Sequence, residues 1–209
     1  MRVSQALAVD GRAVMGLIAA DTKLNVSTVY MRPGFAYGGS CLPKDVASLA
    51  HQSRAAGVAS PLLESLASSN DAAISHAVRL VLASRPVKVA LLGLAFKNNT
   101  DDLRDSPAVV LAKTLIGEGC ELAIFDRHVH ESALVGGNRA FIDAYLPHFA
   151  RMMVDDPDTA LRDADLAIVS YASPEHVAAV ERSGVGRVVD LAGAWDTAPS
   201  SADYVGAGW

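Results

Sequence analysis

The sequence predicts an α/β protein in which a helical segment precedes an open, doubly wound parallel sheet of the Rossmann-like type. Two observations support this fold class. Up to residue 85 the apolar residues recur at helical spacing, and from residue 86 short apolar runs alternate with helical ones. Parallel strands need crossover connections, so such alternation is typical of a sheet with helices on both faces. We therefore divide the chain into a central helical segment, 1–85, and an α/β domain, 86–209.

The first part is expected to contain helices over 3–8, 11–20, 43–56 and 61–83. The last of these carries a stripe of apolar residues at helical spacing. The stripe consists of Leu62, Leu66, Ile74, Val78 and Val81. A stripe of this kind predicts a helix with one buried face. A helix that packs within its own chain would show such a stripe.

The second part is expected to contain four strands and three helices. The strands are predicted over 87–96, 121–125, 166–170 and 187–191. The helices are predicted over 106–116, 158–162 and 174–182. The segment 128–154 shows no regular period, so no element is assigned to it.

Composition restricts the classes of partner. A formal net charge of −5 gives no electrostatic basis for binding nucleic acid. The longest apolar run, 87–96, is too short to cross a bilayer, and the first 20 residues lack the apolar core of a secretory signal. Cys41 and Cys120 lie far apart, and the six histidines share no metal-ligand spacing. These features predict a cytoplasmic protein with no metal, nucleic-acid or membrane partner.

The most informative motif is a glycine-rich loop that delivers a cysteine to the start of a helix. Residues 32–45 read Arg-Pro-Gly-Phe-Ala-Tyr-Gly-Gly-Ser-Cys-Leu-Pro-Lys-Asp. Gly38 and Gly39 are expected to leave room for a substrate beside the backbone. The amide groups of a helix start and the neighbouring Lys44 favour an anionic sulfur, so Cys41 is predicted to be a nucleophile. The alternative is a buried structural cysteine, for which glycines, a proline and a lysine are unusual neighbours.

A second motif lies in the polar loop between the first predicted strand and the helix that follows it. Lys97 and Arg104 lie in this loop, at the carboxyl end of the strand, where open parallel sheets bind their ligands. Two cations beside a helix start could form a phosphate site. They could equally pair with the three aspartates of the same loop. Gly93 is the single glycine here, so the loop is not a dinucleotide-binding fingerprint.

The two loops, together with Asp-Thr-Lys-Leu-Asn at 21–25, resemble the UDP-glucose/GDP-mannose dehydrogenase family. The resemblance extends over the whole chain but covers the family's central and C-terminal portions alone. It does not include the N-terminal NAD-binding domain or the helix that supplies a catalytic lysine and asparagine. Family members oxidise the C6 alcohol of a nucleotide sugar to a carboxylate in two hydride transfers to NAD. The resemblance therefore implies part of an NAD-dependent nucleotide-sugar dehydrogenase, expected to be inactive without the NAD domain. By this resemblance the residues of the cysteine loop favour GDP-mannose as the substrate, oxidised to GDP-mannuronate, and a UDP-sugar is the alternative substrate.

The resemblance also implies roles for individual residues. Cys41 would attack the intermediate aldehyde to give a thiohemiacetal, and oxidation of that adduct would give a thioester that water hydrolyses. Asp45 would assist the water and the proton transfers, and its first-turn position also suits the helix dipole. The positions that match substrate contacts are Tyr30, Arg32, Phe35, Gly38 and Lys97. The positions that match cofactor contacts are Lys44 and Arg104.

In the family the central helices form a dimer interface, so a homodimer is expected, with a nucleotide sugar as the other partner. Two further functions fit the same residues. One is a nucleotide-sugar-binding module without chemistry of its own. The other is a cysteine hydrolase that uses Cys41 with a distant histidine. Cys120 is expected to pack inertly, and the histidines are expected to be surface or core residues.

Overall fold

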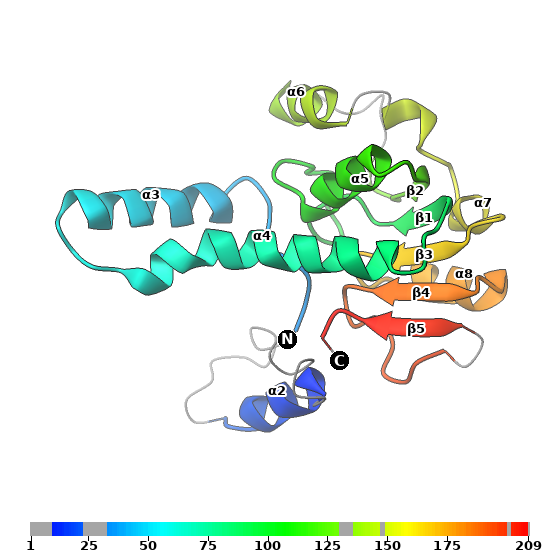
Figure 1. The fold of residues 1–209 in the computed structure, drawn as a ribbon, viewed down its shortest axis with the longest axis horizontal. Helices are drawn as coiled ribbons and strands as arrows, with labels where there is room; N and C mark the ends of the chain where they lie inside the picture. Colours follow the sequence, from blue (N-terminus) through cyan, green and yellow to red (C-terminus); the bar gives the residue numbers. More distant parts are fainter. Residues whose placement is uncertain (1–9, 23–32, 130–135, 147–148, 200–201, 209) are drawn as a thin grey trace.

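The computed structural model describes residues 10–22, 33–129, 136–146, 149–199 and 202–208. The predicted helix over 3–8 lies outside these ranges. In Figure 1 a helical hairpin extends from one side of an α/β domain, and its second helix continues along that domain. The hairpin consists of α3 (Leu42–Ala55) and α4 (Pro61–Leu82). A shorter helix, α2 (Gly11–Ala19), lies below the sheet in Figure 1.

The α/β domain is built on a five-stranded sheet in which every neighbouring pair is parallel, in the order β2-β1-β3-β4-β5. The strands are β1 (Lys88–Leu92), β2 (Glu121–Phe125), β3 (Leu166–Val169), β4 (Arg187–Asp190) and β5 (Asp203–Gly206). The helical elements are α5 (Pro107–Gly117), α6 (Gly136–Tyr145), η3 (Phe149–Arg151), α7 (Pro157–Leu161) and α8 (Pro174–Ser183). Strand order reverses between β1 and β3, which is the point where such sheets bind ligands.

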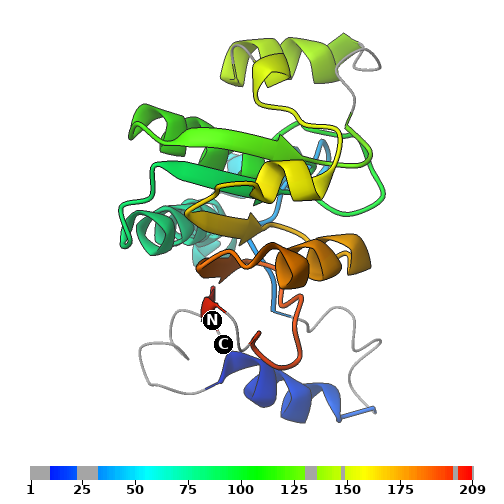
Figure 2. The ribbon, with the colours of Figure 1, turned by 90° about the vertical axis from the view of Figure 1, so that its right-hand side faces the viewer.

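Each face of the sheet carries its own apolar core, which confirms the doubly wound class. Figure 2 shows α4 and α5 on one side of the sheet and α7 and α8 on the other. Leu91 of β1 and Leu111 of α5 belong to the first core, and its α4 members are Ala77 and Val81. Leu92 of β1 belongs to the second core, with α7 and α8 residues. The last turns of α4 therefore pack directly on the sheet.

The structure confirms most predicted elements to within one or two residues and corrects three. The strand predicted over 87–96 ends at Leu92, because Gly93 has a φ of 97° and turns the chain out of the sheet. The helix α6 lies within the unassigned segment 128–154. β5 was not predicted, and it adds a fifth strand at the edge of the sheet. No helix among the described residues is both long and apolar enough to cross a membrane.

Candidate functional site

The glycine-rich loop is docked on the loop that follows β1, so the two sequence motifs meet. A Cβ on Gly38 would lie 2.3 Å from the backbone oxygen of Asp105 and 2.6 Å from Cδ of Pro107. A Cβ on Gly39, whose φ is 89°, would lie 2.9 Å from the ring of Phe96. We expected these glycines to leave room for a substrate. The structure shows that the space beside each is filled by the chain itself, because the two loops approach at backbone distance.

Cys41 lies at the start of α3 with its side chain exposed. It is the N-cap residue, and its carbonyl oxygen accepts a hydrogen bond of 3.0 Å from the Asp45 amide. Pro43 consequently occupies the second helical position rather than the first. The Sγ atom of Cys41 makes no capping bond and lies 3.8 Å from Oγ of Ser40. The exposure of Cys41 excludes the buried structural cysteine that was the alternative interpretation.

Two cations lie near Cys41: Lys44 is in the first turn of the same helix, and Arg104 is in the loop on which the cysteine loop is docked. Lys44 Nζ donates a 2.7 Å hydrogen bond to Asp45, and this bond is the main cause of the raised pKa of Lys44. The pKa of Arg104 is also raised, chiefly by its hydrogen bond to Asp102. A Cys41 thiolate contributes to both increases. The structure thus brings together both predicted catalytic residues, Cys41 and Asp45, and both predicted cofactor contacts.

Arg104 and Lys97, the two cations of the second loop, have different surroundings. Arg104 donates from Nε and Nη2 to the two carboxylate oxygens of Asp102, each at 2.9 Å, as the aspartate-pairing alternative predicted. Lys97 is exposed and forms no ion pair within the described part of the chain, and its Nζ lies 5.2 Å from the ring centre of Phe96. Of the two, Lys97 is therefore the one available to bind a phosphate.

Asp102 connects Arg104 to the cysteine loop. Only 16% of its side chain is exposed, and its Oδ1 also accepts from the Arg104 amide at 3.0 Å. These bonds from Arg104 are the main reason that the pKa of Asp102 is lowered, and a hydrogen bond with the Ser40 side chain contributes. Neither Ser40 nor Asp102 was predicted as a site residue. The short Asp-x-Arg spacing was the signal that could have identified Asp102.

Buried polar groups fix the loop after β1. The carboxylate of Asp126, which follows β2, accepts from the amides of Leu94 at 2.7 Å and Ala95 at 2.9 Å. Ser106 occupies the N-cap position of α5, but its hydroxyl donates to the Leu94 carbonyl at 2.6 Å instead of capping the helix. Gly93 packs against Ser170 and Tyr171 at the end of β3. The loop that receives the cysteine motif is therefore rigidly held at the β1/β3 switch point.

A polar contact from α4 also reaches the cysteine loop, and the sequence did not predict it. The Asn70 side chain accepts from the Tyr37 amide at 2.8 Å and donates to the Tyr37 carbonyl at 2.9 Å. The nearby Phe35, a predicted substrate contact, is partly buried against the core on the α4 side of the sheet. Tyr30 and Arg32, the other predicted substrate contacts of this loop, lie outside the described residues.

Groups away from this site behave as structural residues. Cys120 is buried, its Sγ lies 3.5 Å from the Pro86 carbonyl oxygen, and burial raises its pKa. His176 is buried against Phe125 and Tyr171, and burial lowers its pKa. Within the described ranges, no three His, Cys, Asp or Glu residues are grouped so that they could hold a metal ion.

The sheet order and the docked cysteine loop define a class: a doubly wound α/β protein whose preceding helical segment presents a thiol at the carboxyl ends of the strands, where sheets of this class bind ligands. Comparison with known protein families then identifies the particular family within this class. The central-domain model of the UDP-glucose/GDP-mannose dehydrogenase family matches residues 1–72, and the UDP binding domain model of that family matches residues 90–196. The chain belongs to this family.

Known relatives resemble the chain over almost its whole length. It is 43% identical over 199 residues to the GDP-mannose 6-dehydrogenase of Pseudomonas savastanoi pv. phaseolicola, covering 95% of the chain and 45% of that protein. It is 44% identical over 192 residues to the Pseudomonas aeruginosa enzyme of the same name, covering 91% and 44%. A crystal structure of a ternary complex of GDP-mannose dehydrogenase from P. aeruginosa superimposes with a TM-score of 0.80 at 41% identity, covering 99% of the chain and 48% of that structure. The chain thus spans about half the length of these relatives.

Proposed function

We propose that this chain supplies the cysteine loop and the nucleotide-sugar-binding domain of an NAD-dependent dehydrogenase that oxidises GDP-mannose to GDP-mannuronate. The observation that carries the proposal is the exposed Cys41 at the N-cap of α3, docked at the switch point of the sheet. In this proposal residues 1–85 form the central segment and residues 86–209 bind the nucleotide sugar. The relatives that support it are GDP-mannose 6-dehydrogenases of about twice this length.

Cys41 is proposed to hold the intermediate between the two oxidations. Its sulfur adds to the carbonyl carbon of the sugar aldehyde, a C–S bond forms, and the carbonyl oxygen gains a proton to give a thiohemiacetal. Loss of a hydride and that proton converts the adduct to a thioester. Water then attacks the thioester carbon, the C–S bond breaks, and the carboxylate leaves while Cys41 regains its thiol. Asp45, four residues further on, is proposed to assist the attacking water.

NAD would accept the two hydrides when it is bound. Lys44 and Arg104 fit a contact with this anionic cofactor, because both are exposed cations beside Cys41. Their present acidic partners, Asp45 and Asp102, are the groups that a cofactor phosphate would compete with. The side chains of Lys44 and Asp45 are both exposed, so exchanging that partner costs little free energy. Asp102 is largely buried, so exchanging the partner of Arg104 costs more.

Substrate binding is proposed to centre on Lys97 and the cysteine loop. Lys97 is exposed and unpaired among the described residues, so its charge is available to the diphosphate of the nucleotide sugar. The proposed contacts in the cysteine loop are Tyr30, Arg32, Phe35 and Gly38. For Gly38, the contact would be made by its backbone, since the space beside its Cα is filled by Asp105 and Pro107.

A homodimer is proposed to form through the α3–α4 hairpin. The exposed fractions of Leu42, Leu49 and Leu62 are 50%, 51% and 74%, so the hairpin presents apolar surface that a second copy could cover. Size-exclusion chromatography with light scattering tests this directly. A mass equal to that of one chain would refute the dimer.

Activity is tested by fusing the chain to the N-terminal half of the P. aeruginosa GDP-mannose 6-dehydrogenase. NADH formation with GDP-mannose is expected, and Cys41→Ser is expected to abolish formation of the carboxylate. Intact-mass spectrometry should detect a covalent sugar adduct on Cys41. A fusion that binds both ligands but forms neither NADH nor an adduct would refute the enzymatic proposal, and turnover with UDP-glucose in place of GDP-mannose would refute the substrate.

A binding module without chemistry predicts a different pattern. Calorimetry on this chain would then show GDP-mannose binding that survives Cys41→Ala and weakens with Lys97→Ala. If Cys41 is catalytic, the Cys41→Ala variant of the fusion should also lose turnover. The hydrolase alternative requires a standing thiolate, so alkylation of Cys41 at the rate of an ordinary thiol would exclude it.

A further inference from the structure

The apolar stripe of α4 contains one polar residue, Asn70. Leu66 and Ile74 lie four residues before and after it, so all three share one face of the helix. Asn70 is partly buried on that face. Placing an amide side chain at a buried position costs free energy unless its donor and acceptor are both satisfied. The break in the stripe therefore points to a specific partner.

The partner is the backbone of Tyr37 in the cysteine loop. Oδ1 of Asn70 accepts from the Tyr37 amide at 2.8 Å, and Nδ2 donates to the Tyr37 carbonyl at 2.9 Å. The side chain thereby satisfies both backbone polar groups of one residue, as a neighbouring strand does in an antiparallel hydrogen-bonded pair. The reverse orientation of the amide would place two donors and two acceptors face to face. An asparagine at this position thus matches the loop backbone specifically.

The bonds act on the part of the loop that leads directly to the thiol. Immediately after Tyr37, Gly38 and Gly39 pack on the loop that follows β1. The segment is therefore held by α4 on one side and by the α/β domain on the other, and Cys41 follows two residues later. This double attachment fixes the segment that leads to Cys41, near Lys44 in the first turn of α3 and near the docked loop that carries Arg104.

We propose that Asn70 is a positioning residue for Cys41: through its two bonds to Tyr37 it holds the cysteine loop so that the thiol stays beside Lys44 and Arg104. This inference rests on the proposed function for its importance in turnover. The effect of Asn70 on the position of the thiol is a property of this chain alone. It can therefore be tested without activity.

The test compares Asn70→Asp and Asn70→Leu with the parent chain. Both replacements keep the size of the side chain; aspartate loses the donor to Tyr37, and leucine loses both bonds. Ser68→Ala is the matched control, because it removes only a bond within α4, to the Ser65 carbonyl. The first measurement is hydrogen exchange of the peptide that contains Tyr37. The second is the rate of Cys41 alkylation by iodoacetamide at low and high salt, followed by peptide mass spectrometry.

We expect exchange at Tyr37 to become roughly tenfold faster in both Asn70 variants, since each loses at least one loop-closing bond. Alkylation of Cys41 at low salt should change by about threefold, because the loosened loop no longer holds the sulfur in one position relative to Lys44 and Arg104. The salt dependence of alkylation should weaken with it, because salt screens exposed charges. Ser68→Ala should leave the exchange at Tyr37, the alkylation rate and its salt dependence at the parent values.

Faster exchange at Tyr37 with an unchanged alkylation rate and unchanged salt dependence would overturn the proposal, because Asn70 would then stabilise the loop without positioning the thiol. If an Asn70 variant fails to fold, Asn70→Gln, which keeps both polar groups, replaces it and should retain at least about half of the parent alkylation rate. An inactive fusion enzyme together with the expected alkylation results would refute the proposed function and leave the role of Asn70 intact.

Discussion

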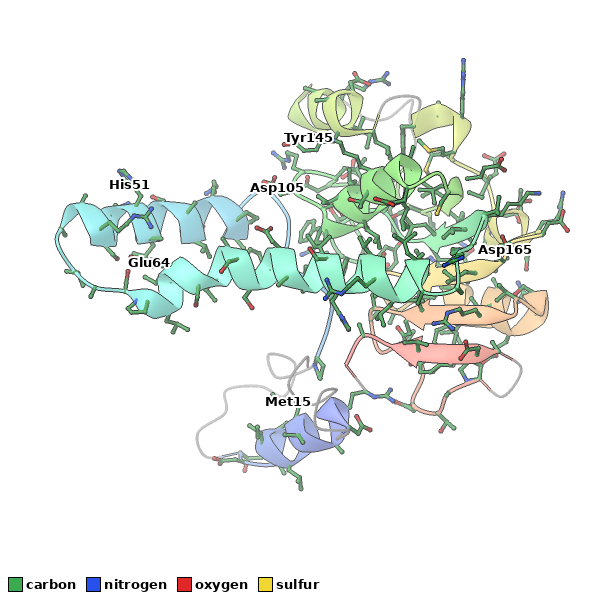
Figure 3. All side chains as sticks on the ribbon, viewed as in Figure 1. Met15, His51, Glu64, Asp105, Tyr145 and Asp165 are labelled. Carbon is green, nitrogen blue, oxygen red and sulfur yellow. The ribbon has the colours of Figure 1, made fainter. Side chains whose placement is uncertain are left out.

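Gly38→Ala offers a sharp test of how the two loops are joined. The new methyl group would lie 2.3 Å from the Asp105 carbonyl oxygen and 2.6 Å from Cδ of Pro107, whereas Cβ atoms keep at least 3.0 Å. One loop must therefore move by about 0.7 Å, the difference between 2.3 and 3.0 Å. The opposing oxygen belongs to the backbone of Asp105, which is labelled in Figure 3. Asp105 has a φ of 49° and precedes the buried Ser106, so its backbone has little freedom to move away.

We expect Gly38→Ala to lower the free energy of unfolding by about 1–3 kcal/mol, the usual cost of overpacking. The displaced loop should also change the alkylation rate of Cys41. Urea denaturation followed by circular dichroism measures the first effect. Peptide mass spectrometry after iodoacetamide treatment measures the second, with the buried Cys120 as an internal reference.

Gly34→Ala is the matched control in the same loop. A Cβ on Gly34 would have no atom within 4 Å, so this variant should unfold at the parent urea concentration or slightly above it. If Gly38→Ala matches Gly34→Ala in both unfolding and alkylation, the close docking of the two loops is wrong.

Three further predictions concern stability. Hydrogen bonds from Arg104 hold the pKa of Asp102 below its ordinary value of 3.8. The ionised Asp102 therefore contributes its full stabilisation above pH 3.8, and this stabilisation is lost as the pH falls through the lowered pKa. Asp102→Asn should therefore cost about 1–2 kcal/mol near neutral pH and nothing at strongly acidic pH in urea titrations. Burial lowers the pKa of His176 below 6.5, so the unfolded chain takes up the proton first and stability falls as the pH drops below 6.5. His176→Phe should reduce that slope by up to about 1.4 kcal/mol per pH unit, and an unchanged slope would contradict the burial argument. Leu111→Ala, in the core far from the loops in sequence, should cost about 2–5 kcal/mol in urea denaturation and leave Cys41 alkylation unchanged under native conditions.

The regular elements were predictable because the periodic apolar residues and the turn residues at their boundaries indicate the same helices and strands. The strand over 121–125 was predicted with the bounds observed for β2, since an apolar run follows a glycine-bearing turn. α6 was missed because it begins with Gly136 and Gly137, which have poor helix propensity. β5 was missed because four residues with only one fully buried member give a weak alternating pattern.

The cysteine motif was recognisable from its own residues, but its attachment was not. Gly38 meets a backbone oxygen 67 positions later, and the partner in that contact has no side-chain signature that a sequence could show. Asn70 bonds backbone groups of Tyr37, which every residue except proline carries. A break in the apolar stripe was the one visible signal, and it indicates a polar contact without naming the partner. Pairings of this kind emerge from the fold rather than from local pattern.

The backbone-level contact between the cysteine loop and the loop after β1 has a consequence for recombination. A chimaera that joins the central segment of one family member to the α/β domain of another would pair loops that had not been selected to fit at such short range. A junction near residue 85 would divide this contact and also the core that α4 shares with the sheet. A crossover placed before residue 33 would transfer the thiol, α4 and the sheet as one exchangeable module.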